Sequence, residues 1–128
     1  LMPIINFPQK PDKEPPFFSE IKEDGYHIYN LKNAKEPNYY PSELPQYPGV
    51  ALKDLKEDEV ITIRAFFGIG KGKNMRVESG YVDVQVEFID QNSVIGAILT
   101  ELPDHFALKT GESIEVFEQE ILDKVEQE

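Results

Sequence analysis

Gly80-Tyr-Val-Asp-Val-Gln-Val-Glu-Phe88 is the stretch that decides the fold of this 128-residue chain. Every second residue from 82 to 88 is apolar, and the residues between them are polar. The apolar positions are Val82, Val84, Val86 and Phe88. Alternation with a period of two is typical of a β-strand that packs one face on a core and exposes the other to water. We therefore predict a half-buried strand here.

Three further segments predict an antiparallel sheet around this strand. Val60–Phe67 is rich in β-branched and aromatic residues, which favour strands. The polar turn Asp90–Ser93 predicts a hairpin with Val94–Leu99, and Ser113–Phe117 predicts a closing strand. The expected core consists of the inward-facing side chains Ile61, Ile63, Phe67, Val82, Val84, Val86, Phe88, Ile95, Ile98 and either Ile114 or Val116.

The two ends of the chain differ from this middle part. Nine of the ten prolines lie in residues 1–48, and proline fixes φ and donates no hydrogen bond. We predict a Pro/Tyr-rich arm and connection over 1–48, extended at its start, and a β-rich globular core over 49–128. Apolar residues at 121, 122 and 125 predict a short amphipathic C-terminal helix. The expected fold is α+β and mostly β, with a curled antiparallel sheet or partly open small barrel.

Composition restricts the function more than it defines it. The formal charge of -11 argues against nucleic acid and anionic membrane partners, and fits a basic protein partner. The absence of cysteine excludes disulfides, thiolate catalysis and cysteine zinc sites. No apolar run approaches the ~20 residues of a membrane-spanning helix. The absence of cysteine suits the cytosol and the cell surface equally, so the compartment is left open: a cytoplasmic location is slightly favoured, and a chain that opens on Leu1 also fits a surface or secreted mature form.

The first candidate site is a loop rich in glycine and lysine. Four of the thirteen positive charges, Arg64, Lys71, Lys73 and Arg76, fall within thirteen residues. Such a basic spot could bind an anion. The loop does not match the phosphate-binding Walker pattern, because Asn74 replaces the hydroxyl residue and a strand is expected to follow. A solvated loop remains the competing interpretation.

The second and third candidates are aromatic and acidic. Tyr39, Tyr40 and Tyr47 alternate with prolines, and could form a recognition surface or pack back onto the sheet. Residues 101–128 hold nine acidic residues against two lysines. Within this acidic segment, Glu115 and Glu118 are the predicted binding residues. The segment could attract a basic partner or simply be solvated.

Catalytic and metal chemistry find little support in the sequence. His27 and His105 lie far apart, and only Asp104 stands beside one of them as an orienting carboxylate. The acidic runs lack the spacing of a calcium loop. We therefore predict no cofactor, no metal and no catalytic residue.

The part of the chain from Leu52 onward resembles a bacterial domain family of unknown function, the YegJ-type domain. The similarity rests on Tyr81-Val-Asp-Val84, Gly96, Pro103, Leu108–Val116 and Ile121-Leu-Asp123. The chain departs from the family in having no tryptophan and in placing Glu112 where aspartate is usual. The resemblance covers about the last 75 residues. It implies a small β-rich bacterial domain and no particular activity.

These observations lead to one main hypothesis and two alternatives. The main hypothesis is a non-enzymatic protein-binding module, such as an acidic inhibitor or immunity-like partner of a basic protein. The first alternative is a binder of small anionic ligands, or an enzyme, that uses the basic loop with His105 as a helper. The second is a surface or assembly protein that its proline-rich arm spaces from an anchor.

Overall fold

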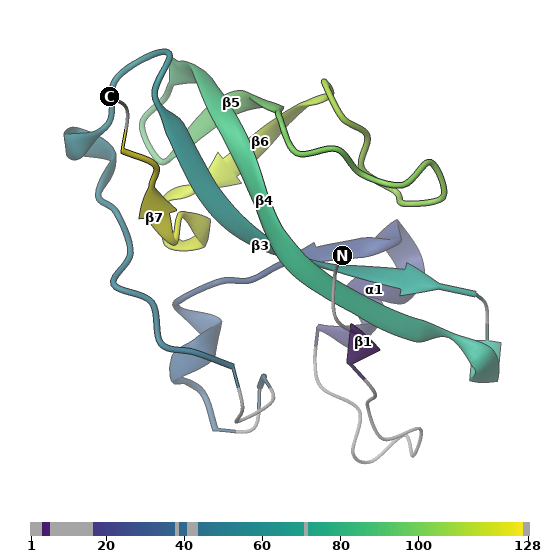
Figure 1. The fold of residues 1–128 in the computed structure, drawn as a ribbon. Helices are drawn as coiled ribbons and strands as arrows, with labels where there is room; N and C mark the ends of the chain where they lie inside the picture. The colour runs from purple at the N-terminus through teal and green to yellow at the C-terminus, as the bar shows by residue number, and fades with distance from the viewer. Residues whose placement is uncertain (1–3, 6–16, 38, 41–43, 71, 127–128) are drawn as a thin grey trace.

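The computed structural model describes residues 4–5, 17–37, 39–40, 44–70 and 72–126. In this part of the chain, a curled antiparallel sheet forms a half-barrel and is accompanied by one short α-helix (Figure 1). The prediction of a mostly β, α+β fold is thereby confirmed. The strands and the helix, in chain order, are β1 (Ile4–Ile5), α1 (Phe18–Asp24), β2 (Tyr26–Ile28), β3 (Val60–Ile69), β4 (Arg76–Ile89), β5 (Ser93–Ile98), β6 (Ser113–Phe117) and β7 (Asp123–Lys124). Single 3-10 turns span Asn33–Lys35, Leu52–Asp54, Gly72–Asn74 and Glu118–Glu120.

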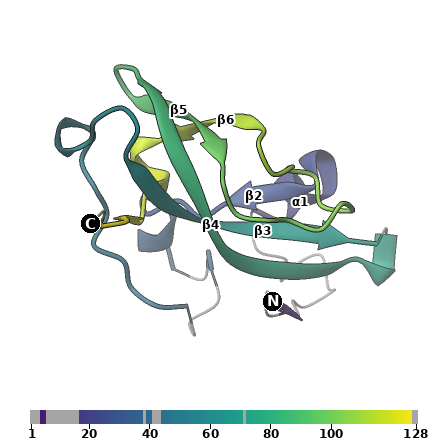
Figure 2. The same cartoon turned by 45° about the horizontal axis from the view of Figure 1, so that its top comes forward.

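The long hairpin of β3 and β4 is the spine of the molecule (Figures 1 and 2). It is paired from Val60↔Gln85 to Ile69↔Arg76. Because β3 occupies one edge of β4 throughout, β1 and β5 share the other edge, at opposite ends. In the same way β2 and β7 share the outer edge of β3. One end of the β3–β4 hairpin is therefore flanked by β1 and β2, and the other end by β5 and β7.

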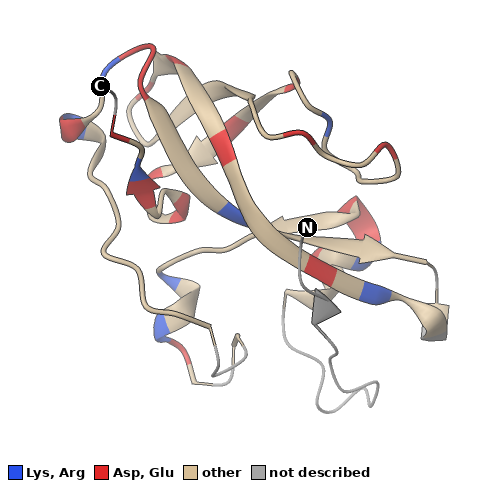
Figure 3. Cartoon of the chain, viewed as in Figure 1, with Lys and Arg blue, Asp and Glu red and all other residues tan. Residues whose placement is uncertain are grey.

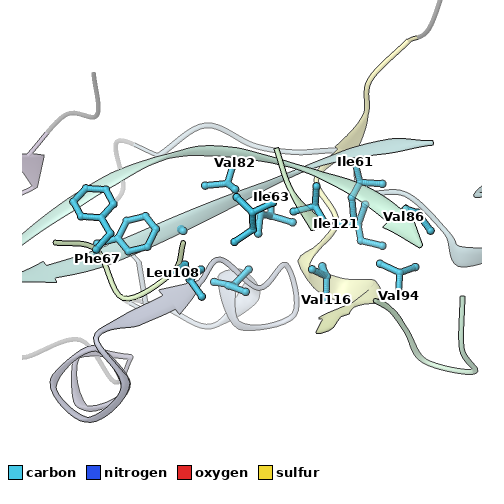
Figure 4. Close-up of a cluster of buried hydrophobic side chains, with 14 of the residues drawn as sticks. Ile61, Ile63, Phe67, Val82, Val86, Val94, Leu108, Val116 and Ile121 are labelled. Atoms are coloured by element: carbon cyan, nitrogen blue, oxygen red, sulfur yellow. The ribbon is translucent and has the colours of Figure 1, made fainter. Parts of the chain in front are cut away.

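The main core fills the concave side of the curled sheet (Figure 4). Alternate residues of β3 and β4 reach it, as the period-two pattern predicts, and their partners come from β5, β6 and the loop between them. Its fully buried members include Ile61, Ile63, Phe67, Val82, Val84, Val86, Val94, Ile98, Phe106, Val116 and Ile121. The predicted hairpin of β4 and β5 is confirmed, with the Asp90 amide donating to the Ser93 carbonyl in its turn.

Two of the predicted core positions are wrong: a β-bulge in β4 turns Phe88 outward, and Ile95 lies three residues before the buried Ile98, on the other face of the regular strand β5. The register of β4 against β5 shifts between Val86 and Phe88, so that the period-two pattern breaks at Glu87. Phe88 therefore points away from the core and is 54% exposed. Its cross-strand partner Ile95 is only half-buried, while the neighbouring Val94 takes the core position.

The predicted C-terminal helix is wrong. Residues 118–120 make one 3-10 turn, and β7 then pairs with Ile61 and Thr62 of β3. Ile121 and Leu122 are both fully buried, but in two different clusters on opposite sides of the sheet. Consecutive side chains point in opposite directions only in an extended chain, so a helix could not bury both.

A second core covers the opposite face of the sheet. It joins α1 to Phe66 of β3, and its fully buried members are Phe17, Phe18, Ile21, Phe66, Val77 and Leu122. The helix ends at Gly25, whose φ of 86° suits glycine and whose amide bonds to the Ile21 carbonyl. The described residues between 17 and 48 therefore pack with the described residues after 48, and β2 is a strand of the same sheet. The predicted extended start of the arm lies largely outside the described residues.

Candidate binding sites

The convex face of β4, β5 and β6 carries an aromatic and acidic surface. Phe88, Ile95 and Glu115 stand directly opposite one another across the three strands. Phe117 follows Glu115 by two residues, on the same face, and is 44% exposed. Glu87, in the bulge, accepts a hydrogen bond from Ser113 across β5 at 2.8 Å. We call these five residues, Glu87, Phe88, Ile95, Glu115 and Phe117, the outer face.

The whole net charge of the protein resides in the half of the sequence that forms this surface. Residues 1–76 contain eleven acidic and eleven basic residues, whereas residues 77–128 contain thirteen acidic residues and two lysines. In Figure 3, β5 carries no charged residue, and red dominates over blue in β6 and in the loop that joins β5 to β6. The outer face thus lies in a field of one sign, which a basic partner would feel before contact.

The two predicted acidic residues have different surroundings. Glu115 is exposed and receives a hydrogen bond from the buried Ser93 hydroxyl at 2.7 Å, which orients its carboxylate on the outer face. Glu118 is half-buried and accepts the Leu52 amide at 2.9 Å. Glu118 therefore ties the connection before β3 to the 3-10 turn, and only Glu115 belongs to the outer face.

Glu120 is an acidic residue whose ionisation is coupled to folding. Burial raises its pKa from 4.5 to about 7, although the Phe117 amide that its carboxylate accepts at 2.9 Å opposes this shift. The unfolded chain releases this proton at lower pH than the folded chain does. The stability of the fold should therefore decrease as pH rises from about 4.5 to about 7.

We expect Glu120→Gln to remove up to about 3 kcal/mol of this pH dependence, because glutamine still accepts the Phe117 amide but cannot ionise. Urea unfolding at pH 5 and pH 8 measures the effect. The wild type should lose stability between these values by more than the variant does. Glu126→Gln, an exposed change near the same end of the chain, is the control. An equal loss in wild type and Glu120→Gln would contradict the assignment.

The predicted tyrosines lie against the second core rather than on the outer face. Tyr40 donates to or accepts from His27 Nε2 at 2.6 Å, and its hydroxyl accepts the Asn30 amide at 3.0 Å. Burial raises the pKa of Tyr40 and lowers that of His27. Glu20 contacts the other ring nitrogen of His27 and partly opposes the lowering. Tyr39 is half-buried and its hydroxyl accepts the Asn33 side-chain amide at 3.1 Å.

Tyr47 packs on the second core and also contacts Arg64. The Arg64 Nη1 donates to the Tyr47 hydroxyl at 2.9 Å, and that hydroxyl lies 2.8 Å from the Tyr81 hydroxyl. Burial raises the pKa of Tyr47 to about 12, so the hydroxyl stays protonated at neutral pH. The three side chains join the connection before β3 to the middle of the β3–β4 hairpin, where Arg64 pairs with Tyr81.

The predicted basic loop is not assembled into one site by the described residues. Arg64 lies in mid-strand and is buried, whereas Arg76 is exposed and pairs with Ile69 at the far end of the hairpin. Arg76 lies five positions from Tyr81 along β4, which corresponds to about 17 Å of strand. Lys71 and the side chain of Lys73 lie outside the described part of the structure. A hollow beside the glycines Gly68, Gly70 and Gly72 is also lined by the acidic residues Glu23 and Asp24.

His105 lies in a cavity with Arg64, but Asp104 does not orient it. In the described part of the chain, no hydrogen bond joins the two neighbours, and the Asp104 carbonyl instead accepts Lys109 Nζ. Among the described residues, no three histidine or carboxylate side chains gather closely enough to hold a metal ion. None of the described helices has the length and apolar character needed to cross a membrane.

No match was found in comparisons with protein-family models, with curated proteins or with solved structures. The resemblance to the YegJ-type family therefore stays a prediction. The outer face is the feature that sequence reasoning missed, since the alternating pattern placed Phe88 in the core. Phe117 did carry a signal, because it falls on the solvent side of the alternating stretch Ser113–Phe117.

Proposed function

We propose that this protein is a non-enzymatic binding module that holds a basic protein partner on its outer face. The observation that carries the proposal is the exposure of two phenylalanines, Phe88 at 54% and Phe117 at 44%, beside ordered carboxylates. Large apolar side chains on the wet face of a sheet leave aromatic surface in contact with water. Such surface is typical of a binding site when polar residues surround it.

The chemistry of the surface supports a protein as the partner. Aromatic side chains supply most of the energy at the centre of an interface, and flanking carboxylates supply charge selectivity. The negative charge of residues 77–128 would accelerate encounter with a basic surface and repel nucleic acid. The five side chains of the outer face include no serine, cysteine or histidine, and its two carboxylates, Glu87 and Glu115, are held by serine hydroxyls, which favours binding over catalysis. An inhibitor or immunity-like partner of a basic protein would have this character.

The amount of basic protein that this protein captures should decrease strongly when residues of the outer face are substituted. The experiment is affinity capture from cell extract of a protein whose retention depends on salt. We expect Phe88→Ser and Glu115→Lys each to reduce the captured amount of that protein at least tenfold, because each alters the centre of the surface. Val125→Ser and Glu36→Lys are matched controls, since they change an exposed apolar residue and an exposed carboxyl elsewhere.

The captured protein must also meet two conditions of its own. It should be basic, and raising the salt from 50 mM to 500 mM should release it, because screening weakens the long-range attraction. A partner retained equally by Phe88→Ser and by Glu115→Lys would show that binding uses another surface, and the proposed role of the outer face would then be abandoned.

A further inference from the structure

A cavity of about 700 Å³ lies beside β4, away from the outer face. One wall is the stretch Glu78–Tyr81 of β4, which begins at the last residue that pairs with β1 and ends before the residues that pair with β5. The opposite wall is the loop between β5 and β6, which contributes Thr100, Glu101, Pro103, His105 and Phe106. Its volume lies within the range of sites for small ligands. None of its lining residues belongs to the outer face.

Arg64 brings a buried positive charge to this cavity. Its side chain is only 7% exposed, and in the described part of the chain no carboxylate forms an ion pair with it. Nε donates to the Ser79 hydroxyl at 2.8 Å and Nη1 donates to Tyr47 at 2.9 Å. These partners are neutral, so the guanidinium charge is solvated by hydroxyls and ring faces but is not neutralised. A buried cation without a counter-ion is costly, and an anionic ligand would relieve that cost.

The remaining nitrogen of Arg64 is positioned to meet such a ligand. No hydrogen bond is recorded for Nη2 in the described residues, and no buried side-chain nitrogen among them lacks a partner. Nη2 must therefore be open to solvent, and Arg64 lines the cavity. The guanidinium carbon lies 5.4 Å from the Tyr81 ring centroid and 5.9 Å from that of Phe66. These contacts and the two hydrogen bonds hold the guanidinium in place before any ligand arrives.

The rest of the lining restricts the kind of anion. Glu78 and Glu101 also border the cavity, so a doubly charged phosphate would meet repulsion that a single negative charge meets less strongly. Pro103, Phe106 and the Tyr81 ring offer an apolar wall to the body of a ligand. Planar carboxylates match the hydrogen-bonding geometry of guanidinium.

We propose that this cavity binds a small monocarboxylate with an apolar body, whose carboxylate contacts Arg64 and whose body packs on Tyr81, Pro103 and Phe106. The site is independent of the outer face, so a molecule bound there would act in addition to the protein partner.

The test uses 3-phenylpropionate as the probe, with the neutral 3-phenyl-1-propanol and inorganic phosphate for comparison. In calorimetric titrations the full chain should bind 3-phenylpropionate, and bind the alcohol and phosphate at least tenfold more weakly. Arg64→Gln should weaken probe binding at least tenfold, because a charge-assisted hydrogen bond is lost. Arg76→Gln makes the same charge change at an exposed site on the same hairpin and should alter binding less than twofold.

Amide chemical shifts of the wild type make the test independent of whether Arg64→Gln folds. The probe should shift the amides of Ser79, Gly80, Tyr81 and Thr100, and the alcohol should not. Equal shifts with the alcohol, shifts confined to other residues, or no shift at all would overturn the proposal. So would undiminished binding by a folded Arg64→Gln variant.

Discussion

Val84→Asp should leave the protein without a cooperative thermal transition. Val84 is completely buried at the centre of the main core, opposite Ile61 of β3 and Ile98 of β5. A carboxylate at this position would contact neither water nor a cation. Burying such an unpaired charge costs several kcal/mol of folding free energy. Domains of this size have only about 5 to 15 kcal/mol of stability in total. Circular dichroism melting and near-ultraviolet signals measure the loss.

Gln85→Asp is the matched control for this change. It places the same side chain one residue along β4, on the half-buried convex face, where water can solvate the charge. We expect its melting temperature to change by only a few degrees. If Val84→Asp melted like Gln85→Asp, the assignment of the two faces of β4 would be wrong.

Gly96→Ala should destabilise the protein by about 3 kcal/mol, although it adds only one methyl group. A Cβ on Gly96 would lie 2.5 Å from the Gln85 carbonyl oxygen and 2.6 Å from Val84 Cγ1. The first of these neighbours is backbone, so β4 and β5 would have to separate locally to relieve the contact. Such a loss corresponds to a decrease of about 10 °C in melting temperature for a domain of this length.

The adjacent substitution Ala97→Val distinguishes close backbone packing from a general intolerance of β5 to larger side chains. Ala97 is half-buried, and valine favours strands. We expect the free energy of unfolding of Ala97→Val to stay within about 1 kcal/mol of wild type. Chemical denaturation of the three proteins in parallel measures both effects. A Gly96→Ala variant as stable as wild type would mean that β4 and β5 lie farther apart than in this structure.

The two proposed sites divide β4 between them. The outer face uses the part of the strand after the bulge, where β5 and β6 extend the sheet. The Arg64 cavity uses the part before it, where β5 has ended and the loop after β5 forms the second wall. One long strand thus contributes to an aromatic, acidic surface at one end and to a cationic cavity at the other. Variants of one site should leave the other intact, because the sites share no residue.

Much of the sheet was predictable because its signals are local. Alternation in Val60–Phe67 and in Tyr81–Val86 follows from the geometry of a strand, and polar residues 90–93 favour a turn. The bulge at Glu87 was not predictable, because the apolar alternation continues through Phe88 without interruption. The helical spacing of Ile121, Leu122 and Val125 misled for a related reason. The spacing is compatible with a helix, but two cores on opposite sides of the chain determine the conformation.

The sequence by itself determined that the chain forms a mostly β fold, which strands its hairpin pairs, and that its charge is strongly negative. Periodicity, turn residues and composition are properties of short segments, and they need no partner to be recognised. Only the tertiary structure decided which side chains meet. Phe88 and Glu115 lie in one row across β4, β5 and β6. Arg64 contacts Tyr47 and Tyr81 rather than the other residues of the basic loop. Strand register and the curvature of the sheet set these contacts, and both depend on pairing between segments far apart in the chain.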